Sequence, residues 1–429
     1  MKKLFSILLF LSLFVSSFSQ QTKPVFQGQP PVERVETTSR PIEKQEKKTF
    51  AFDEDQVYFS NQFDGARLTQ IERTAENAYT ITILPENSPI NMSPWYAFRV
   101  WSDKKKEIVV KLVYPEFAKH RYSPQISEDG KKWKVLEDRF ITEFEKGTAQ
   151  FGPNSRPKSV DLKLKINKKP IYVSAQELQN SARVFDWTNK LAKKRKFKIE
   201  EIGKSTEGRP IRLLKMGNLD SKKMILVISR QHPPEVTGYF AMQAFVEKIA
   251  DKSKLSKDFR KDWAIYVVPL MNPDGVDNGH WRHNLGGIDL NRDWSDFNQP
   301  ETQAVRDFLK KREAETGGMF YFGIDFHSTW DDIYYPMNQS FTDTNMPNLV
   351  WNWLENIKNA IPNYEPNIQA NAKLEPTVVS RNYFLKAHKM EAIVFEIGDN
   401  TPREFIKKKG EVGAIELMKL MSTEMKKQN

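Results

Sequence analysis

The sequence predicts an all-β sandwich over residues 51–170, followed by an α/β unit over residues 175–425 whose mostly parallel mixed sheet is flanked by helices. Three observations lead to this prediction. The 429-residue length suits roughly two domains, and 39% hydrophobic residues can fill two cores. The first half holds short β-rich runs between turn residues, and the second half alternates apolar runs with helical periodicity. Such alternation is typical of a largely parallel sheet.

The first nineteen residues have the layout of a secretory signal peptide. Lys2-Lys3 precedes an apolar run from Leu4 to Val15, and Ser17-Phe18-Ser19 offers small residues for cleavage after Ser19. The run is shorter than the ~20 residues that a membrane span needs. We therefore expect an exported protein, periplasmic or extracellular, without a transmembrane anchor after signal removal. Residues 20–50 are rich in Gln, Pro, Thr, Glu and Lys, which indicates a flexible linker.

The β unit shows strands and turns at short spacing. Trp95–Trp101 and Ile108–Tyr114 are β-rich runs joined by a charged link, Ser102–Lys106. The turn residues 127–130 and the alternating run Val160–Leu164 continue the pattern. This spacing favours a sandwich.

The second unit alternates strands with helices. Predicted strands are Ile225–Ile228, Ala264–Pro269 and Met319–Phe326, and predicted helices are Gly238–Ala250, Thr302–Glu315, Asn348–Ile361 and Glu411–Met425. Ligands of such sheets bind beyond the carboxyl ends of the strands. His232 and His327 each fall just after a predicted strand.

Composition narrows the possible chemistry. The chain has no cysteine, so it has no disulfide framework, and a metal site must use histidine and carboxylates. The net charge of +11 could attract acidic partners. The lysines, however, are scattered or form tracts such as Lys407–Lys409 without interleaved aromatic residues, which is typical of a solvated surface. We expect no nucleic-acid partner.

The histidines differ in what surrounds them. His120 lies between two basic residues and is predicted to be exposed, and His388 has no obvious partner. His232 and Glu235 lie three residues apart in Ser229–Gly238, where two prolines bar regular structure. An imidazole and a carboxylate at this spacing can bind one zinc ion, although such pairs also arise by chance.

Further motifs follow in order along the chain. They are Glu207-Gly208-Arg209-Pro210, Asn272-Pro273-Asp274-Gly275, Arg282-His283-Asn284, the run 286–294, Gly323–Ser328 and Phe395–Asp399. With the His-Pro-Pro-Glu turn, this series over 175–425 resembles the zinc metallocarboxypeptidases of the carboxypeptidase A kind. The β block and the His-Pro-Pro-Glu variant resemble the cytosolic carboxypeptidase branch, here in an exported form.

The resemblance implies one Zn²⁺ ion held by His232, Glu235 and His327. This His₂Glu set is that of carboxypeptidase A itself and is taken from the resemblance. A fourth position would bind water, whose pKa zinc lowers towards about 7.

The resemblance also implies roles for residues around the ion. Glu396 would be the general base, and Arg282 would polarise the scissile carbonyl. Asn291 and Arg292 would bind the terminal carboxylate of the substrate. Asp289 would accept the second N–H of a ligand histidine.

The substrate-selecting position of the family lies about fifteen residues before the general base, which is Arg381 in this chain. An arginine there would favour an acidic terminal residue, or the free acid of a peptidoglycan stem peptide. The family's substrate-closing tyrosine lies about seven residues earlier, where this chain has Leu374.

Other functions compete with an acid-selective carboxypeptidase. They are a stem-peptide carboxypeptidase or amidase, a zinc-dependent deacylase of a small amino acid, and a non-catalytic binding protein. Structural roles are also open: Asp-Phe-His could be a buried, hydrogen-bonded histidine, and Asn-Arg-Asp-Trp a helix cap. Glu396 favours a catalytic function, because an unpaired buried carboxylate is costly as a structural residue.

Overall fold

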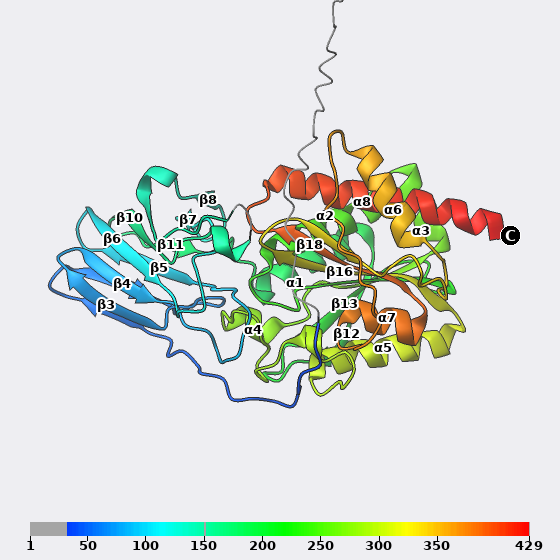
Figure 1. Cartoon of the computed structure of the whole chain (residues 1–429), viewed down its shortest axis with the longest axis horizontal. Helices are drawn as coiled ribbons and strands as arrows, with labels where there is room; N and C mark the ends of the chain where they lie inside the picture. The colour runs from blue at the N-terminus through cyan, green and yellow to red at the C-terminus, as the bar shows by residue number, and fades with distance from the viewer. Residues whose placement is uncertain (1–31, 150–151, 429) are drawn as a thin grey trace, which may run out of the picture.

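A computed structural model describes residues 32–149 and 152–428. The predicted signal peptide, residues 1–19, lies outside the described residues. Figure 1 shows a strand-rich unit, blue to cyan, beside a sheet flanked by helices, green to red. Among the described residues, no helix is both long enough and apolar enough to cross a membrane.

The first unit is a sandwich of two sheets, as predicted. One sheet has the order β1 (Thr49–Phe52), β2 (Val57–Ser60), β5 (Ala97–Ser102), β11 (Ile171–Ser174), β7 (Gln125–Ser127) and β8 (Lys134–Val135). The other has the order β3 (Gln70–Ala75), β4 (Ala78–Thr82), β6 (Lys106–Val113), β10 (Ser159–Ile166) and β9 (Ile141–Phe144). Two 3₁₀ turns, η1 (Asp138–Phe140) and η2 (Pro153–Ser155), lie between strands. Alternate apolar residues of β6 and β10 face the shared core.

Two histidine predictions are wrong. His120 is only 6% exposed, and its Nδ1 lies 2.8 Å from the Tyr114 hydroxyl. Burial lowers the pKa of His120 to about 3, so the ring is neutral. His388 has partners from two helices, with Nδ1 2.9 Å from a carboxylate oxygen of Glu313 and Nε2 3.3 Å from the Tyr383 hydroxyl. Flanking lysines and arginines suggested exposure, but packing of distant segments buried both rings.

The second unit is built on a seven-stranded mixed sheet. Its order is β12 (Lys198–Lys204), β13 (Pro210–Gly217), β15 (Ala264–Val268), β14 (Lys223–Ser229), β16 (Met319–Thr329), β18 (Glu391–Gly398) and β17 (Ile333–Pro336). The four central strands, β15, β14, β16 and β18, are parallel, and the strands beyond them are antiparallel. The predicted fold class is therefore confirmed, with parallel pairing confined to the centre.

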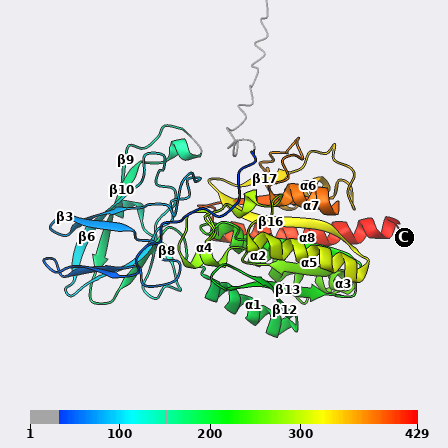
Figure 2. The ribbon, with the colours of Figure 1, turned by 90° about the horizontal axis from the view of Figure 1, so that it is seen from below.

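Helices cover both faces of this sheet. The helices are α1 (Ser181–Arg195), α2 (Val236–Ile249), α3 (Lys254–Asp262), α4 (Pro273–Asp277), α5 (Pro300–Thr316), α6 (Leu349–Ala360), α7 (Ser380–His388) and α8 (Arg403–Gln428), with a 3₁₀ turn η3 (Leu290–Arg292). Residues of α1, α2, α3, α6 and α8 share one core with the sheet. Helices α5 and α7 pack on the opposite face (Figures 1 and 2).

Two details differ from the sequence prediction. Strand β16 continues to Thr329, so His327 lies inside the strand rather than after it. Helix α8 begins at Arg403, and the lysine tract predicted to be solvated includes Lys409, which is 0% exposed. Its Nζ lies 2.8 Å from an Asp332 carboxylate oxygen and 5.1 Å from the centre of the Phe395 ring. The ion pair and the aromatic ring offset the loss of hydration.

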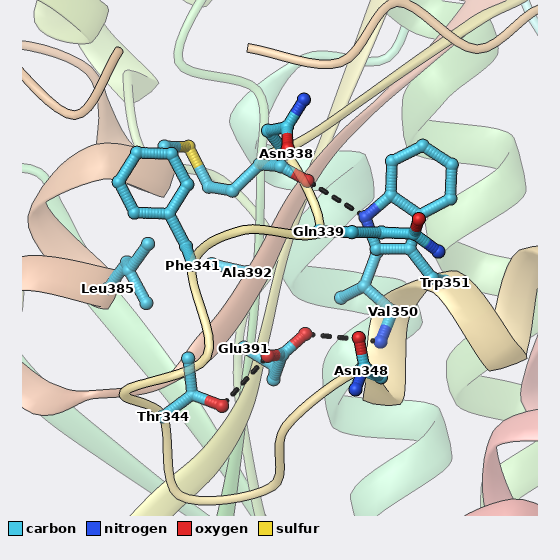
Figure 3. A pocket seen from close by; sticks show the side chains of 11 residues that line it. Asn338, Gln339, Phe341, Thr344, Asn348, Val350, Trp351, Leu385, Glu391 and Ala392 are labelled. Carbon is cyan, nitrogen blue, oxygen red and sulfur yellow. Dashed lines mark hydrogen bonds between the residues drawn. The ribbon is translucent and has the colours of Figure 1, made fainter. Parts of the chain in front are cut away.

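The loop between β17 and α6 is joined to the start of β18 (Figure 3). The Glu391 carboxylate accepts hydrogen bonds from the Thr344 hydroxyl, 2.8 Å, and from the Val350 N–H in the first turn of α6, 3.2 Å. A carboxylate at a helix N-terminus satisfies free N–H groups and the helix dipole. This contact ties α6 to the strand that carries Glu396.

The described part of the predicted linker is residues 32–50, of which 49–50 belong to β1 and 32–48 have no helix or strand but are held by hydrogen bonds. The Arg40 N–H donates to the Gly286 carbonyl at 2.7 Å, and the Gln299 amide donates to the Thr37 carbonyl at 2.7 Å. Figure 2 shows the segment, in dark blue, passing along the helix-flanked unit before it enters the β unit. The described part of the linker is therefore anchored against the second unit.

Candidate active site

Two histidines and a glutamate converge at the carboxyl ends of the central strands. His232 Nδ1 lies 2.8 Å from Glu235 Oε1, and His327 Nδ1 lies 2.8 Å from Glu235 Oε2. The two Nδ1 atoms are 3.1 Å apart. These ligand atoms lie within 4.8 Å of one another, and all three residues are buried. Two imidazoles and a carboxylate form a donor set that suits zinc.

The local fold brings the three side chains together. After β14, Arg230 has a positive φ of 58° and its guanidinium donates to the Pro233 carbonyl at 2.7 Å, which supports the turn. Glu235 is the residue at the N-terminal end of α2. A Cβ atom on Gly238 would lie 2.2 Å from the His327 carbonyl oxygen, so glycine lets α2 approach β16 closely.

Carboxylates orient both imidazole rings. His232 Nε2 lies 2.8 Å from Asp289 Oδ1, as predicted for Asp289, and His327 Nε2 lies 2.8 Å from Asp325 Oδ2. These contacts hold the Nε2 hydrogens and leave each Nδ1 facing the centre of the site. Asp325 was missed, although it lies two residues before His327 on the same strand face, a spacing that could have revealed it.

The Glu235 carboxyl group is ionised. Burial alone would raise its pKa, but His232 and His327 outweigh this effect and lower the pKa below its ordinary value. An ionised carboxylate is the form that binds a metal ion.

Glu396 faces the same centre from β18. It is the partner of His327 in the parallel register of β16 and β18, so both side chains lie on one face of the sheet. Glu396 is 7% exposed, and no described residue makes a hydrogen bond with its Oε2. Burial, with the nearby Glu235 charge, raises the pKa of Glu396 despite His327 and Arg282. A buried carboxylate with a raised pKa is suited to proton transfer near neutral pH.

Arg282 and the Asn291–Arg292 pair are held by Asp289. Its Oδ2 accepts a hydrogen bond from Arg282 Nε at 2.7 Å, and its Oδ1 accepts one from the Asn291 N–H at 2.8 Å. Arg292 lies further away, with Nη1 3.8 Å from Asp289 Oδ2. Asn291 Oδ1 accepts from the Ser380 N–H at 2.9 Å, which links η3 to α7.

Arg381 lies in the first turn of α7, buried at 5% exposure. Its Nη1 donates to the Tyr335 carbonyl at 2.9 Å, and its Nε donates to Asn382 Oδ1 at 3.1 Å. Burial lowers the pKa of Arg381 to about 10, so it remains charged at neutral pH. Within the described part of the chain, no carboxylate forms a salt bridge with it, whereas a buried arginine normally has a charged partner.

All eight predicted site residues line one cavity of about 380 Å³. They are His232, Glu235, Arg282, Asn291, Arg292, His327, Arg381 and Glu396. Sequence reasoning missed other lining residues, including Val32, Tyr335, Asn382 and the loop residues Gln369–Lys373. Tyr335 lines the cavity, whereas Leu374, at the position counted for the family's tyrosine, contributes a carbonyl to Asn382 Nδ2 at 2.8 Å.

Comparison with protein families identifies this arrangement. A family model described as zinc carboxypeptidase matches residues 184–411, which is more than half of the 429-residue chain. The chain belongs to the zinc carboxypeptidase family. The match contains all eight predicted residues of the cavity.

Individual relatives of the chain include one that is named as a carboxypeptidase. An uncharacterised protein of Zymomonas mobilis is 27% identical over 277 residues, covering 62% of this chain and 66% of that protein. Cytosolic carboxypeptidase 6 of Mus musculus is 23% identical over 294 residues, covering 62% of this chain and 52% of that protein. Matches to these two relatives therefore span about half to two thirds of their lengths.

Solved structures share the fold of both units. A metallo-carboxypeptidase from Burkholderia cenocepacia superimposes with a TM-score of 0.69 at 19% identity, covering 87% of this chain and 100% of that one. A metallo-carboxypeptidase from Pseudomonas aeruginosa, in complex with (2-guanidinoethylmercapto)succinic acid, gives a TM-score of 0.65 at 20% identity, covering 85% and 99%. Coverage of this extent includes the β sandwich as well as the zinc carboxypeptidase unit.

Proposed function

We propose that the protein is a zinc-dependent metallocarboxypeptidase that hydrolyses the C-terminal peptide bond of peptides and favours an acidic terminal residue. The observation that carries the proposal is the shared cavity. It places a His₂Glu ligand set, a buried carboxylate and four cationic or amide side chains around one space. The reaction needs these groups together.

Each side chain has a distinct task in this reaction. His232, Glu235 and His327 would hold Zn²⁺, which supplies Lewis acidity by lowering the pKa of a coordinated water and polarising the carbonyl. Glu396 takes the proton of the attacking water on its carboxylate and transfers it to the leaving amine.

The cationic side chains bind the substrate. Arg282 donates hydrogen bonds to the scissile carbonyl oxygen as negative charge develops there. Asn291 and Arg292 bind the terminal carboxylate, and this contact restricts cleavage to the last peptide bond.

The acidic preference rests on Arg381. Its guanidinium is buried, and two of its nitrogen atoms donate to neutral oxygens of Tyr335 and Asn382. A substrate carboxylate would be the first anionic partner for this charge, and charge-assisted pairs of this kind are among the stronger hydrogen bonds in proteins. A neutral terminal side chain would leave the cation without a partner.

We also propose that the protein is exported. The basic pair Lys2-Lys3, the short apolar run after it and the small residues before position 20 support this proposal. An exported carboxypeptidase could meet peptidoglycan stem peptides, whose free acid groups are a second source of the chemistry that Arg381 favours.

The test is hydrolysis of matched peptides by the zinc-supplied protein. The peptides end in Glu, Phe, Lys or a stem-peptide diamino acid, and an N-acylated small amino acid tests for deacylase activity. Release of the terminal residue from the Glu peptide, with Glu396→Gln inactive, is the expected result. Preference for Phe or Lys would contradict the acidic pocket, and activity on the N-acylated amino acid alone would favour a deacylase. A protein that binds zinc stoichiometrically but cleaves nothing would be a binding protein.

A further inference from the structure

The β unit contributes one carboxylate to the loop that carries Arg282. Glu86 lies after β4, in the sandwich, and is 0% exposed. Its Oε2 accepts a hydrogen bond from the Trp281 N–H at 2.7 Å. Its Oε1 accepts from the Arg282 N–H at 3.1 Å and from the His283 N–H at 2.8 Å. One side chain thus binds three consecutive backbone amides across the boundary between the two units.

The charge of Glu86 is stable in this position. Burial alone would raise its pKa, but His280, His283 and Arg67 outweigh burial and lower the pKa to about 2. The group is therefore a carboxylate at neutral pH. An ionised acceptor makes hydrogen bonds roughly twice as strong as a neutral one.

Neighbouring residues reinforce the contact. Asn87 Oδ1 lies 2.5 Å from His283 Nδ1, and Asn87 Nδ2 donates to the Gly287 carbonyl at 3.0 Å. On the other side, the Glu43 N–H donates to the Glu86 carbonyl at 2.7 Å. The loop over residues 280–287 is therefore fixed from the β unit at several points.

Arg282 is thereby held at both ends. Glu86 fixes its backbone amide, and Asp289 fixes its side chain through Nε at 2.7 Å. Among the described residues, no other side-chain group accepts a hydrogen bond from the Trp281, Arg282 or His283 amide. Arg282 also lines the cavity that holds the His₂Glu set and Glu396.

We propose that Glu86 is a positioning residue for Arg282, so that the β sandwich contributes to catalysis through this side chain. The proposal rests on the proposed carboxypeptidase function. An oxyanion donor acts by its exact location, and a displacement near 1 Å can cost about 10²-fold in rate. Since Arg282 acts on charge that develops in the transition state, its misplacement should lower kcat and leave KM largely unchanged.

The decisive variant is Glu86→Gln. The amide keeps the side chain's size and one oxygen, but its NH₂ group faces a backbone N–H that needs an acceptor. A matched control is Asp55→Asn, in the same β unit. Asp55 is 5% exposed and accepts hydrogen bonds from Arg73, Tyr79 and the Asn77 N–H, all within the sandwich. Both variants therefore replace a buried, multiply bonded carboxylate with an amide, and only one contacts the Arg282 loop.

Two measurements are made on the full-length, zinc-loaded proteins. Amide hydrogen exchange of residues 281–283 is expected to rise by about tenfold in Glu86→Gln and to stay unchanged in Asp55→Asn. With the Glu-ending peptide, kcat is expected to fall by about 10²-fold in Glu86→Gln only, with KM little changed. Asn87→Ala, a milder change at the residue next to Glu86, should shift both the exchange rate and kcat in the same direction. It replaces Glu86→Gln as the test variant if Glu86→Gln does not fold.

Unchanged exchange at residues 281–283 would overturn the proposal, and so would an equal loss of kcat in Asp55→Asn, which would indicate general destabilisation. A wild-type protein without peptidase activity would refute the proposed function. Hydrogen exchange would then still decide whether Glu86 anchors the loop, because that readout does not depend on catalysis.

Discussion

Replacing Arg381 with methionine should reverse the terminal-residue preference of the enzyme. Methionine keeps an unbranched apolar stem like that of arginine and removes the charged guanidinium group. In the wild type, a substrate carboxylate would gain hydrogen bonds from a buried guanidinium, which are worth about 1.5 to 3 kcal/mol. At 1.36 kcal/mol per factor of ten, kcat/KM for the Glu-ending peptide should fall by roughly 13- to 160-fold. The Phe-ending peptide should be cleaved at least as well as before.

The same substitution should not weaken the protein. Burial lowers the pKa of Arg381 from its ordinary value to about 10, which corresponds to a cost of about 3 kcal/mol for keeping the charge buried. The variant loses the hydrogen bonds to Tyr335 and Asn382, at about 1 kcal/mol each. The expected net change is a gain of about 1 kcal/mol in the free energy of unfolding, measured by denaturant titration.

The assay is the ratio of kcat/KM for two peptides that differ only in a terminal Glu or Phe. Lys373→Gln is the matched control, because Lys373 also lines the cavity but is exposed, so its charge is screened by water. The control should leave the ratio nearly unchanged. An unchanged ratio in Arg381→Met, or an equal loss for both peptides, would refute Arg381 as the selecting residue.

Three further outcomes are expected. Arg121→Met should destabilise the protein by about 3 to 5 kcal/mol in denaturant titration. Arg121 forms a buried ion pair between the two units, 2.6 Å from Asp399, and the substitution would leave the Asp399 charge without its partner. An unchanged denaturation midpoint would contradict this prediction. Burial raises the pKa of Glu301 from 4.5 to about 7, so its contribution to stability is full below pH 4.5 and declines by up to about 3 kcal/mol as the pH rises to about 7. Glu301→Gln should remove that decline in thermal melts at pH 5 and pH 8, and equal declines in both proteins would disprove it. Removal of zinc by a chelator should lower the Tm, and one equivalent of zinc should restore it, since an ion at a thousand times its Kd stabilises by about 4 kcal/mol. The Tm of a His327→Ala protein should respond to neither treatment. Restoration of the Tm by zinc in that variant would argue against His327 as a ligand.

The residues expected to bind zinc and to act as general base came from a resemblance to a known family, and that resemblance is carried by short local motifs. His232 and Glu235 lie in one turn that prolines exclude from regular structure, and His327 and Glu396 lie near the carboxyl ends of apolar runs. Parallel strands bring their carboxyl ends to one edge, and in the structure these residues lie together there. Short motifs of this kind, in a family's order, also allowed Arg282 and its neighbours to be named.

Environments that depend on distant packing were not predictable. Lys409 and His120 stand among charged neighbours in the sequence, yet each is buried by segments far away along the chain. No periodicity of a single segment encodes such a contact. Charged neighbours in the sequence do not show that the residue between them is exposed, because their long side chains can reach solvent from a buried backbone.

By itself the sequence determined the fold class and the alternation of strands and helices in the second unit, because these follow from hydrophobic periodicity. Its short motifs also carried the family resemblance that implies which residues bind zinc and transfer a proton. Only the tertiary structure decided that Arg381 is buried with no carboxylate partner among the described residues, and that Glu86 reaches the Arg282 loop. The first property depends on how α7 packs on the strands of its own unit, and the second depends on how the two units pack against each other. Docking of this kind is set by the shapes and charges of whole surfaces, which no local pattern records.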